Sequence, residues 1–441
     1  MLIKASAAAK KWGINERRVR CLARQGRIKG AVLINKRWYI SSDAKKPDFK
    51  SYKESLEQQK YPYNTFSSGE YGIYGGVHMP ESFAKYFDPM LEAFKQMIST
   101  SAFDKRAKAY LKDTPMYVPE KFNKTLGNVK VIIKREDLNT GGSLYMNQAY
   151  LLALLLKRIK KDKIMIAAGS AAYALAIAKA CHDVGVMCKI FIPYRDYLKQ
   201  TDEFDKIHEY NPEFLYICER EGSLYNATNY AFREYLMNDG KSLFCLNDAV
   251  GPHPIPVIVE FCQSCIGHAV QLQLKRMGIT RVSAIVAPAN VASNALGIFA
   301  KASSRSKLVV VESSTSNSII RDGHVGIVDG MKTKTLTSKG YCEFNGDCAC
   351  GAMSFPALNP KIADGIERGK YQVGSVTDIE AMQACKEFFE LEGIFPALED
   401  GYTLAYIKKR AKRMKSGNIL MCFTSKGDKD KDFIVSTLSS M

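Results

Sequence analysis

The chain has 441 residues, of which 46% are hydrophobic and 24% charged, as is ordinary for a globular protein with two or three cores. Its longest apolar stretch, residues 164–181, contains Lys179 and predicts a strand followed by a buried helix, which argues against a membrane span. Twelve cysteines follow no disulfide framework and nothing resembles a signal peptide, so we expect reduced thiols in the cytoplasm.

The net charge of +18 is unevenly distributed along the chain. Residues 1–60 hold 16 Lys and Arg against 5 Asp and Glu. A localised basic block of this kind indicates a polyanionic partner, because a charge that served solubility alone would be spread over the surface.

Residues 1–47 predict a small domain of helix, turn, helix and hairpin. Gly13 ends the first helix, and Asn15 can cap a second helix over residues 16–25. Two short runs within residues 31–40, rich in β-branched and aromatic residues, then predict a hairpin.

This pattern resembles the winged helix-turn-helix domain of the MerR-like, excisionase type, and the resemblance covers essentially all of residues 1–47. It implies double-stranded DNA as a partner, with the second helix in the major groove and the hairpin on the flank. Seven cations would make these contacts: Arg17, Arg18, Arg20, Arg24, Arg27, Lys36 and Arg37. Two alternatives stay open, a merely solvated basic face and a domain that no longer binds DNA.

Residues 48–70 are polar without sustained periodicity and predict a linker. A large α/β body is expected over residues 71–441. Its most informative stretch begins with a β-branched run at residues 131–133, which predicts a buried strand. Gly141 and Gly142 then allow a close backbone approach, and an apolar helix follows. Strand, glycine turn and buried helix together are typical of a small-molecule site.

The body resembles the β chain of tryptophan synthase, a pyridoxal-phosphate (PLP) enzyme of fold type II. The resemblance rests on motifs that keep one order along the chain, at residues 74–81, 134–137, 251–254, 393–399 and 427–430. It implies a two-lobed α/β fold and a homodimer.

Several positions depart from the family's site. Tyr145 stands where the family has its Schiff-base lysine, and Ala167 stands where it has its catalytic glutamate. Val291 and Ala292 replace glycines of the phosphate cradle. A phenol cannot replace an amine in covalent capture of an aldehyde. From these losses we expect no catalytic residues, no cofactor and, in particular, no covalently bound PLP.

A ligand pocket is nevertheless compatible with the residues that remain, and a small aromatic molecule or an amino acid would suit it. Its candidate lining is Gly142, Ser143, Tyr145, Asn147, Tyr173, Ser293, Asn294, Glu399 and Thr424. No metal site is expected, because the pairs Cys262/Cys265 and Cys348/Cys350 lack further ligands at suitable spacing.

The leading hypothesis from the sequence is a DNA-binding protein, a transcriptional regulator whose catalytically inactive body serves dimerisation and ligand sensing. Two alternatives remain. One is a PLP-dependent lyase related to the tryptophan synthase β chain, and the other is a scaffold that docks another protein.

Overall fold

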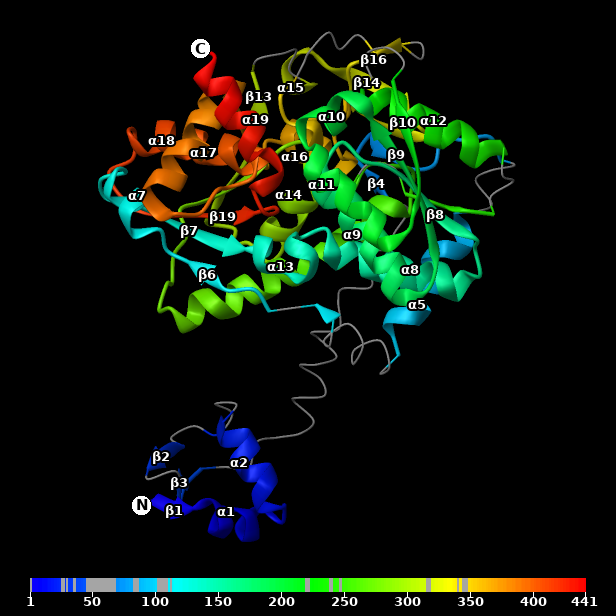
Figure 1. Ribbon diagram of the computed structural model, residues 1–441. Coiled ribbons are helices and arrows are strands. Elements are labelled where there is room, and N and C mark those ends of the chain that lie inside the picture. Colours follow the sequence, from blue (N-terminus) through cyan, green and yellow to red (C-terminus); the bar gives the residue numbers. More distant parts are fainter. Residues whose placement is uncertain are drawn as a thin grey trace. The chain divides into compact units, whose positions relative to one another are not determined.

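The computed structural model divides the chain into two compact units, residues 1–65 and 66–441 (Figure 1). The residues that the structure describes are 2–24, 28, 31–34, 37–44, 69–81, 87–100, 110–111, 113–218, 223–237, 241–245, 248–314, 319–338, 341–342 and 348–441.

The small unit combines two helices with a three-stranded antiparallel sheet in the order β1-β3-β2. Its elements are β1 (Leu2–Lys4), α1 (Ala5–Trp12), α2 (Glu16–Arg24), β2 (Val32–Ile34) and β3 (Arg37–Ser41). The structure adds the strand β1, which the sequence did not predict, because three residues are too few for a periodicity to be recognised.

The helix ends of the small unit follow the predicted local chemistry. Gly13 closes α1 at φ 62°, a left-handed conformation that costs glycine no steric penalty. The Arg17 backbone N–H donates to Asn15 Oδ1 at 2.8 Å, which satisfies a free amide at the start of α2. Apolar residues on the inner faces of both helices pack against Ile40 of β3. The core that they form includes Trp12, Val19 and Leu22.

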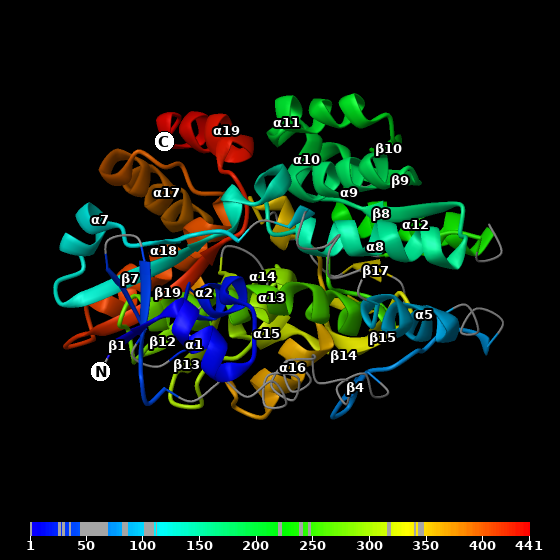
Figure 2. The same cartoon turned by 90° about the horizontal axis from the view of Figure 1, so that it is seen from below.

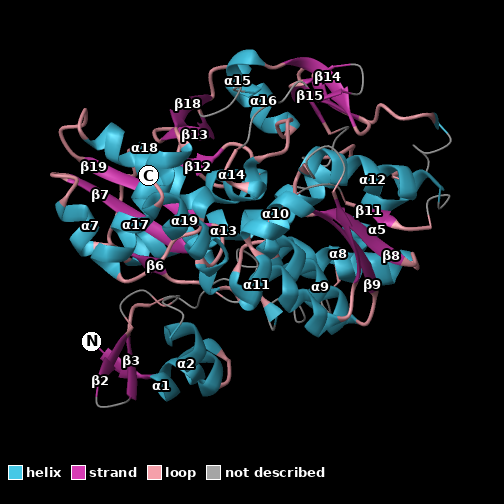
Figure 3. Cartoon of the chain, turned by 45° about the horizontal axis from the view of Figure 1, so that its top comes forward, coloured by secondary structure: helices cyan, strands magenta, loops and turns pink. Residues whose placement is uncertain are grey.

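The body contains two parallel sheets (Figure 3). The larger has the order β18-β13-β12-β19-β7-β6 and is parallel except for its edge pair β6–β7. Its strands are β6 (Met116–Tyr117), β7 (Val129–Arg135), β12 (Ala284–Pro288), β13 (Lys307–Ser313), β18 (Tyr371–Val376) and β19 (Gly417–Phe423). The smaller sheet, β10-β9-β8-β11, consists of β8 (Lys163–Ala167), β9 (Met187–Pro193), β10 (Glu213–Ile217) and β11 (Leu243–Phe244).

Helices surround both sheets (Figure 2). Beside the larger sheet are α7 (Glu120–Lys124), α13 (Ile255–Arg276), α14 (Ala292–Phe299), α16 (Pro360–Glu367), α17 (Asp378–Glu392), α18 (Leu398–Ala411) and α19 (Asp428–Ser439). Beside the smaller sheet are α5 (Asp88–Ile98), α8 (Met146–Ile159), α9 (Ala171–Val184), α10 (Tyr194–Lys199), α11 (Thr201–Asp205) and α12 (Leu224–Met237). Because α13 packs against both α14 and α8, it links the two sheets.

The remaining elements are short. An antiparallel sheet joins β4 (Glu70–Tyr71), β5 (Tyr74–Gly75), β14 (His324–Val328) and β15 (Met331–Thr335), and β16 (Thr337–Ser338) pairs with β17 (Tyr341–Cys342). Single turns are η2 (Glu136–Leu138), η3 (Thr140–Gly142), η4 (Lys206–Tyr210), α15 (Ile319–Asp322) and η6 (Gly351–Met353).

Within the part of the chain that the structure describes, one helix, α13, is long and apolar enough to cross a membrane. Most of its apolar stretch is buried inside the body, where its residues Ile258 and Ile266 are almost inaccessible to solvent. It therefore serves as a core helix of a globular unit.

Candidate active site

The glycine turn brings the start of α8 against the end of β19. Gly141 and Gly142 have φ of 72° and 77°, so the chain reverses sharply after η2. The Lys426 N–H then donates to the Gly142 carbonyl at 3.0 Å, and the Leu144 N–H donates to the Thr424 carbonyl at 2.9 Å. Two segments almost 300 residues apart in the chain thus lie side by side, which is the close backbone approach expected at the two glycines.

Tyr145 lies just before α8 and is buried. Its ring centroid is 5.1 Å from that of Tyr173 on α9, with the ring planes tilted by 54°. Burial raises the pKa of the Tyr145 phenol, and the nearby Asp248 and Glu399 carboxylates raise it further. The residue is therefore a neutral aromatic group in the interior of the site.

Thr424 is the centre of a buried set of hydrogen bonds at the end of β19. Asn294 Nδ2 donates to Thr424 Oγ1 at 2.7 Å, and Thr424 Oγ1 donates to Asp400 Oδ1 at 2.8 Å. Both oxygens of Asp400 also accept from the Thr424 backbone N–H, at 2.9 and 3.0 Å. Burial raises the pKa of Asp400, and the adjacent Glu399 adds to that effect. The sequence predicted Thr424 and Asn294 here but missed Asp400, which lies in a helix start that looked structural.

Ser293 lies in the first turn of helix α14 and is held by groups from two other segments. Its backbone N–H donates to Asp248 Oδ2 at 2.9 Å, and its hydroxyl is hydrogen-bonded to the same carboxyl group. Ser293 Oγ also lies 2.6 Å from Gln148 Oε1 on α8. The sequence indicated Ser293 as a candidate lining residue of a ligand pocket, but it did not reveal Asp248.

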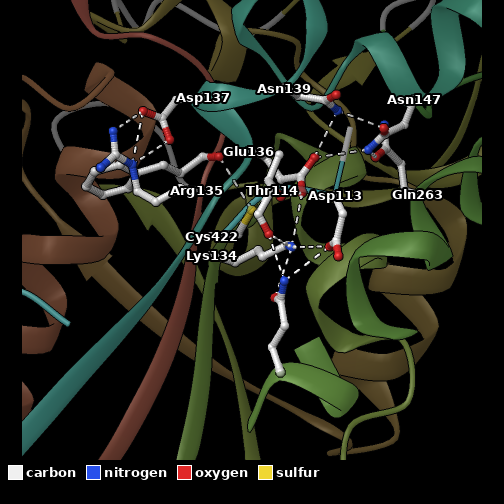
Figure 4. A network of polar contacts seen from close by, with 12 residues as sticks. Asp113, Thr114, Lys134, Arg135, Glu136, Asp137, Asn139, Asn147, Gln263 and Cys422 are labelled. Carbon is white, nitrogen blue, oxygen red and sulfur yellow. Dashed lines mark hydrogen bonds and ion pairs between the residues drawn. The ribbon is translucent and has the colours of Figure 1, made fainter. Parts of the chain in front are cut away.

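Asn147 belongs to a buried polar network that runs from α8 to the end of β7 (Figure 4). It accepts from Asn139 Nδ2 at 2.8 Å and donates to Glu136 Oε2 at 3.2 Å and to Gln263 Oε1 at 3.2 Å. The Lys134 ammonium, 1% exposed, donates to the Thr114 carbonyl at 2.5 Å. These contacts connect the turn between β7 and α8 to α13, and they occupy the side-chain amide of Asn147.

Glu399 is fully buried and forms part of an ionic cluster with the start of α19. Lys429 Nζ donates to Glu399 Oε2 at 2.9 Å and also to Asp430. Ser425 Oγ donates to Glu399 Oε1 at 3.2 Å. Glu399 and Thr424 thus both lie at the carboxyl end of β19, next to the glycine turn that precedes α8.

Three buried polar atoms at this site have no hydrogen-bond partner among the described residues: Ser143 Oγ, Ser170 Oγ and Asn294 Oδ1. Ser143 and Asn294 flank Thr424 from opposite segments. Ser170 precedes the 14-residue helix α9, whose amino end favours a negative group. Because buried polar atoms are normally satisfied, these three fit a bound polar ligand.

The cations predicted to contact DNA lie in the small unit, and only some are described. Arg17 and Arg20 on α2 and Arg37 on β3 are exposed. Arg20 donates to Glu16 Oε1 at 2.5 Å, so one of the predicted contacts is already paired. The side chains of Arg18 and Arg24, and Arg27 and Lys36 altogether, lie outside the described residues.

No group of three or more His, Cys, Asp or Glu side chains within the described ranges is arranged to hold a metal ion. Cys262 and Cys348, which belong to the two cysteine pairs noted in the sequence, are buried, and burial raises their pKa values. They are therefore neutral thiols in the apolar interior.

A family model described as "Pyridoxal-phosphate dependent enzyme" matches residues 108–425. The chain is 31% identical over 392 residues to the tryptophan synthase beta chain of Bacillus subtilis, covering 86% of this chain and 98% of that protein. It is 28% identical over 406 residues to the tryptophan synthase beta chain of Clostridium botulinum, covering 88% of this chain and 97% of that protein.

Two solved structures share the fold. An L-serine ammonia-lyase from the fungus Rhizomucor miehei superposes with a TM-score of 0.58 at 15% identity, covering 75% of this chain and 98% of that one. Threonine deaminase isoform 2 from Solanum lycopersicum superposes with a TM-score of 0.58 at 15% sequence identity. The match covers 85% of this chain and 93% of that one. The chain therefore belongs to the PLP-dependent enzymes of fold type II, and its body is tryptophan synthase β-like.

These findings correct three predictions. The prediction of a transcriptional regulator with a catalytically inactive body is wrong, because the family and the relatives point to a PLP-dependent enzyme and none of them indicates DNA binding. The prediction that the chain is not an enzyme is wrong for the same reason. The prediction that no cofactor is bound is also wrong, since PLP is expected throughout this family.

The physical reason for these errors is the weight given to four replaced side chains, at positions 145, 167, 291 and 292. The site also consists of buried groups that only folding brings together, such as the Asn294–Thr424–Asp400 set and the partnerless hydroxyls of Ser143 and Ser170. The groups around Thr424 fit the polar ring of the coenzyme, whereas the start of α14 already holds the carboxyl group of Asp248.

Proposed function

We propose that this chain is a PLP-dependent lyase that acts on a small β-hydroxy amino acid such as L-serine. The observation that supports this most is the match to 98% of the length of a tryptophan synthase beta chain, combined with the retained polar set around Thr424. The relatives in the two solved structures are named as acting on serine and threonine, which favours the same substrate class.

When bound, PLP would supply an electron sink for negative charge at the substrate's α-carbon. Thr424 and Asn294 would orient its ring, because their polar atoms lie together at the end of β19. Ser170 and the amino end of α9 would take the substrate carboxylate, since an uncompensated hydroxyl and the positive end of a helix dipole both favour an anion. Tyr145 and Tyr173 would exclude water from the same space.

We also propose that Tyr145 takes the place of the family's Schiff-base lysine. Lys429, a buried lysine near Glu399, is held by two carboxyl groups and is poorly placed to substitute. Borohydride reduction of the PLP-loaded chain followed by peptide mass spectrometry tests this point. No modified lysine is expected, and a stoichiometric adduct on one lysine would contradict the proposal.

The enzyme proposal is tested by incubating the purified full chain with PLP and L-serine and measuring pyruvate formation and equilibrium PLP binding. Thr424→Val removes a hydroxyl that connects Asn294 to Asp400, and we expect about tenfold weaker PLP binding, the effect of one lost buried hydrogen bond. Thr403→Val is the matched control, because Thr403 Oγ1 is buried without a partner among the described residues. Absence of both PLP binding and pyruvate in the unmodified chain would refute the proposal.

Separately, we propose that residues 1–47 form a winged helix-turn-helix domain, that residues 48–70 are a linker to the body at 71–441, and that duplex DNA binds the small domain. The three-stranded sheet behind two helices and the exposed Arg17 and Arg37 support this. A homodimer of the body and a cytoplasmic location also stay predictions.

Fluorescence anisotropy with a labelled duplex at several salt concentrations tests the DNA partner. Joint replacement of Arg17 and Arg37 by alanine should weaken binding and lower the salt slope by about 1 for each lost phosphate contact. Replacement of Lys121 and Lys124, two exposed lysines of the body, removes the same charge and should change neither quantity. Equal effects of the two double variants would show that net charge alone causes binding.

A further inference from the structure

The start of helix α14 is closed by a carboxyl group of the chain itself. Asp248 Oδ2 accepts from the Ser293 backbone N–H at 2.9 Å, and Asp248 Oδ1 is hydrogen-bonded to the Ser293 hydroxyl. Asp248 and Ser293 are 5% and 0% exposed, so no solvent competes for these contacts. An amide N–H at the first turn of a helix is the group that ordinarily binds an anionic oxygen of a ligand.

The backbone directs Asp248 into this position. Its φ is 55°, in the left-handed region, which residues with a Cβ atom seldom adopt and aspartate and asparagine tolerate best. Asp248 lies just before the Gly251–Pro254 motif, which is shared with the family, so its placement depends on a turn that the fold retains. A second observation at the same helix start is Asn294 Oδ1, which is buried and has no hydrogen-bond partner among the described residues.

The hydrogens of the cluster can be assigned consistently. Ser293 Oγ has one proton and lies near two acceptors, Asp248 Oδ1 and Gln148 Oε1. Since one proton cannot serve both acceptors, the Asp248 carboxyl group must supply the proton of its own contact with Ser293 Oγ, and burial raises the pKa of Asp248 in the same direction. The Ser293 hydroxyl then donates to Gln148 Oε1 at 2.6 Å, which also accepts from Gln263 Nε2 at 3.0 Å. The Ser293 N–H and hydroxyl are thereby satisfied without a ligand, whereas Asn294 Oδ1 in the same turn has no partner among the described residues.

We propose that Asp248 is an internal plug of the anion cradle at α14, and that a phosphate group binds there only when this carboxyl group withdraws. The proposal rests on the function proposed above and deepens it, because it makes the affinity of the chain for PLP depend on a residue of its own. It assigns Asp248 a positioning role and leaves the ring contacts at Thr424 unchanged.

Two substitutions at this position separate the plug from its charge. Asp248→Gly removes the plug and keeps the left-handed backbone without strain, because glycine adopts positive φ freely. Asp248→Asn keeps the plug, since an amide can accept from the Ser293 N–H, donate to Ser293 Oγ and tolerate the same φ. Asp248→Ser is a second opening variant in case the glycine variant does not fold.

The experiment measures equilibrium binding of PLP and of pyridoxal, which lacks the phosphate, to the full-length wild type and to both variants. We expect Asp248→Gly to bind PLP at least about tenfold more tightly than the wild type, the factor of one hydrogen bond to a charged group, with pyridoxal unchanged. Asp248→Asn should resemble the wild type. Equal PLP affinity in all three proteins, or an equal gain in both variants, would overturn the proposal.

Inorganic phosphate keeps this test separate from the enzyme proposal. If none of the proteins binds PLP, the proposed enzyme function fails, and the plug is judged by thermal unfolding in phosphate against chloride at equal ionic strength. A rise in Tm with phosphate for Asp248→Gly but not for the wild type or Asp248→Asn supports the plug. The same response in all three proteins contradicts it.

Discussion

Replacing Lys429 by methionine is expected to lower the free energy of unfolding of the body by about 3–5 kcal/mol, the cost of leaving a buried charge without its partner. Lys429 is 3% exposed, and its ammonium contacts Glu399, which is fully buried, and Asp430, which is 3% exposed. Burial by itself would lower the pKa of Lys429, but the charges of Asp430 and Glu399 outweigh it and raise that pKa. The lysine is therefore positively charged in the folded body.

The loss should be this large because methionine fills the volume of the lysine stem but offers no donor. Among the described residues, Glu399 Oε2 would then keep only the Cys350 thiol at 3.6 Å, and Asp430 Oδ2 only the Leu398 N–H at 2.8 Å. Since Glu399 and Thr424 reach the same end of β19, weaker PLP binding should accompany the lower stability.

Lys409→Met is the matched control, because Lys409 contacts Glu380 at 2.7 Å on the surface, where the two side chains are 50% and 36% exposed. A solvated pair of this kind contributes at most about 1 kcal/mol. Urea unfolding followed by far-ultraviolet circular dichroism measures both variants. Similar midpoints for the two would mean that the buried cluster does not stabilise the body.

Leu22→Ala is expected to unfold the small unit and to leave the body folded. Leu22 is 2% exposed in a core that includes Trp12, Val19 and Ile40. Removing a buried leucine side chain costs about 2–5 kcal/mol, which is most of the stability that so small a core can supply.

The two tryptophans make this loss measurable in the full chain. Trp12 and Trp38, the only ones in the sequence, both belong to the small unit, so tryptophan fluorescence reports on that unit alone. In Leu22→Ala we expect the tryptophan emission to have the wavelength of solvent-exposed indole before any urea is added. The circular dichroism transition of the body should keep the midpoint of the wild type. As a control, Thr403→Val in the body should leave the fluorescence transition as in the wild type. If Leu22→Ala loses the tryptophan fluorescence signal and the circular dichroism signal at the same urea concentration, the two units do not unfold independently.

Local structure followed the sequence closely where short-range chemistry decides it. Gly13 ends α1, Asn15 caps α2, and Gly141 and Gly142 make the predicted turn. The strand β7 extends two residues past the predicted run, through Lys134 and Arg135, because Lys134 finds buried acceptors on other segments. A charged residue at the end of an apolar run looks like a boundary when those acceptors are unknown.

The sequence by itself determined the α/β class and the tryptophan synthase β-like body, because motifs in one order require one chain path. Only the tertiary structure decided what the site residues touch. Asp248, Asp400, Gln148 and Gln263 come from separate segments, and each is unremarkable among its neighbours in sequence. Their roles arise because burial forces every polar atom to find a partner, and those partners are chosen by the packing of distant segments.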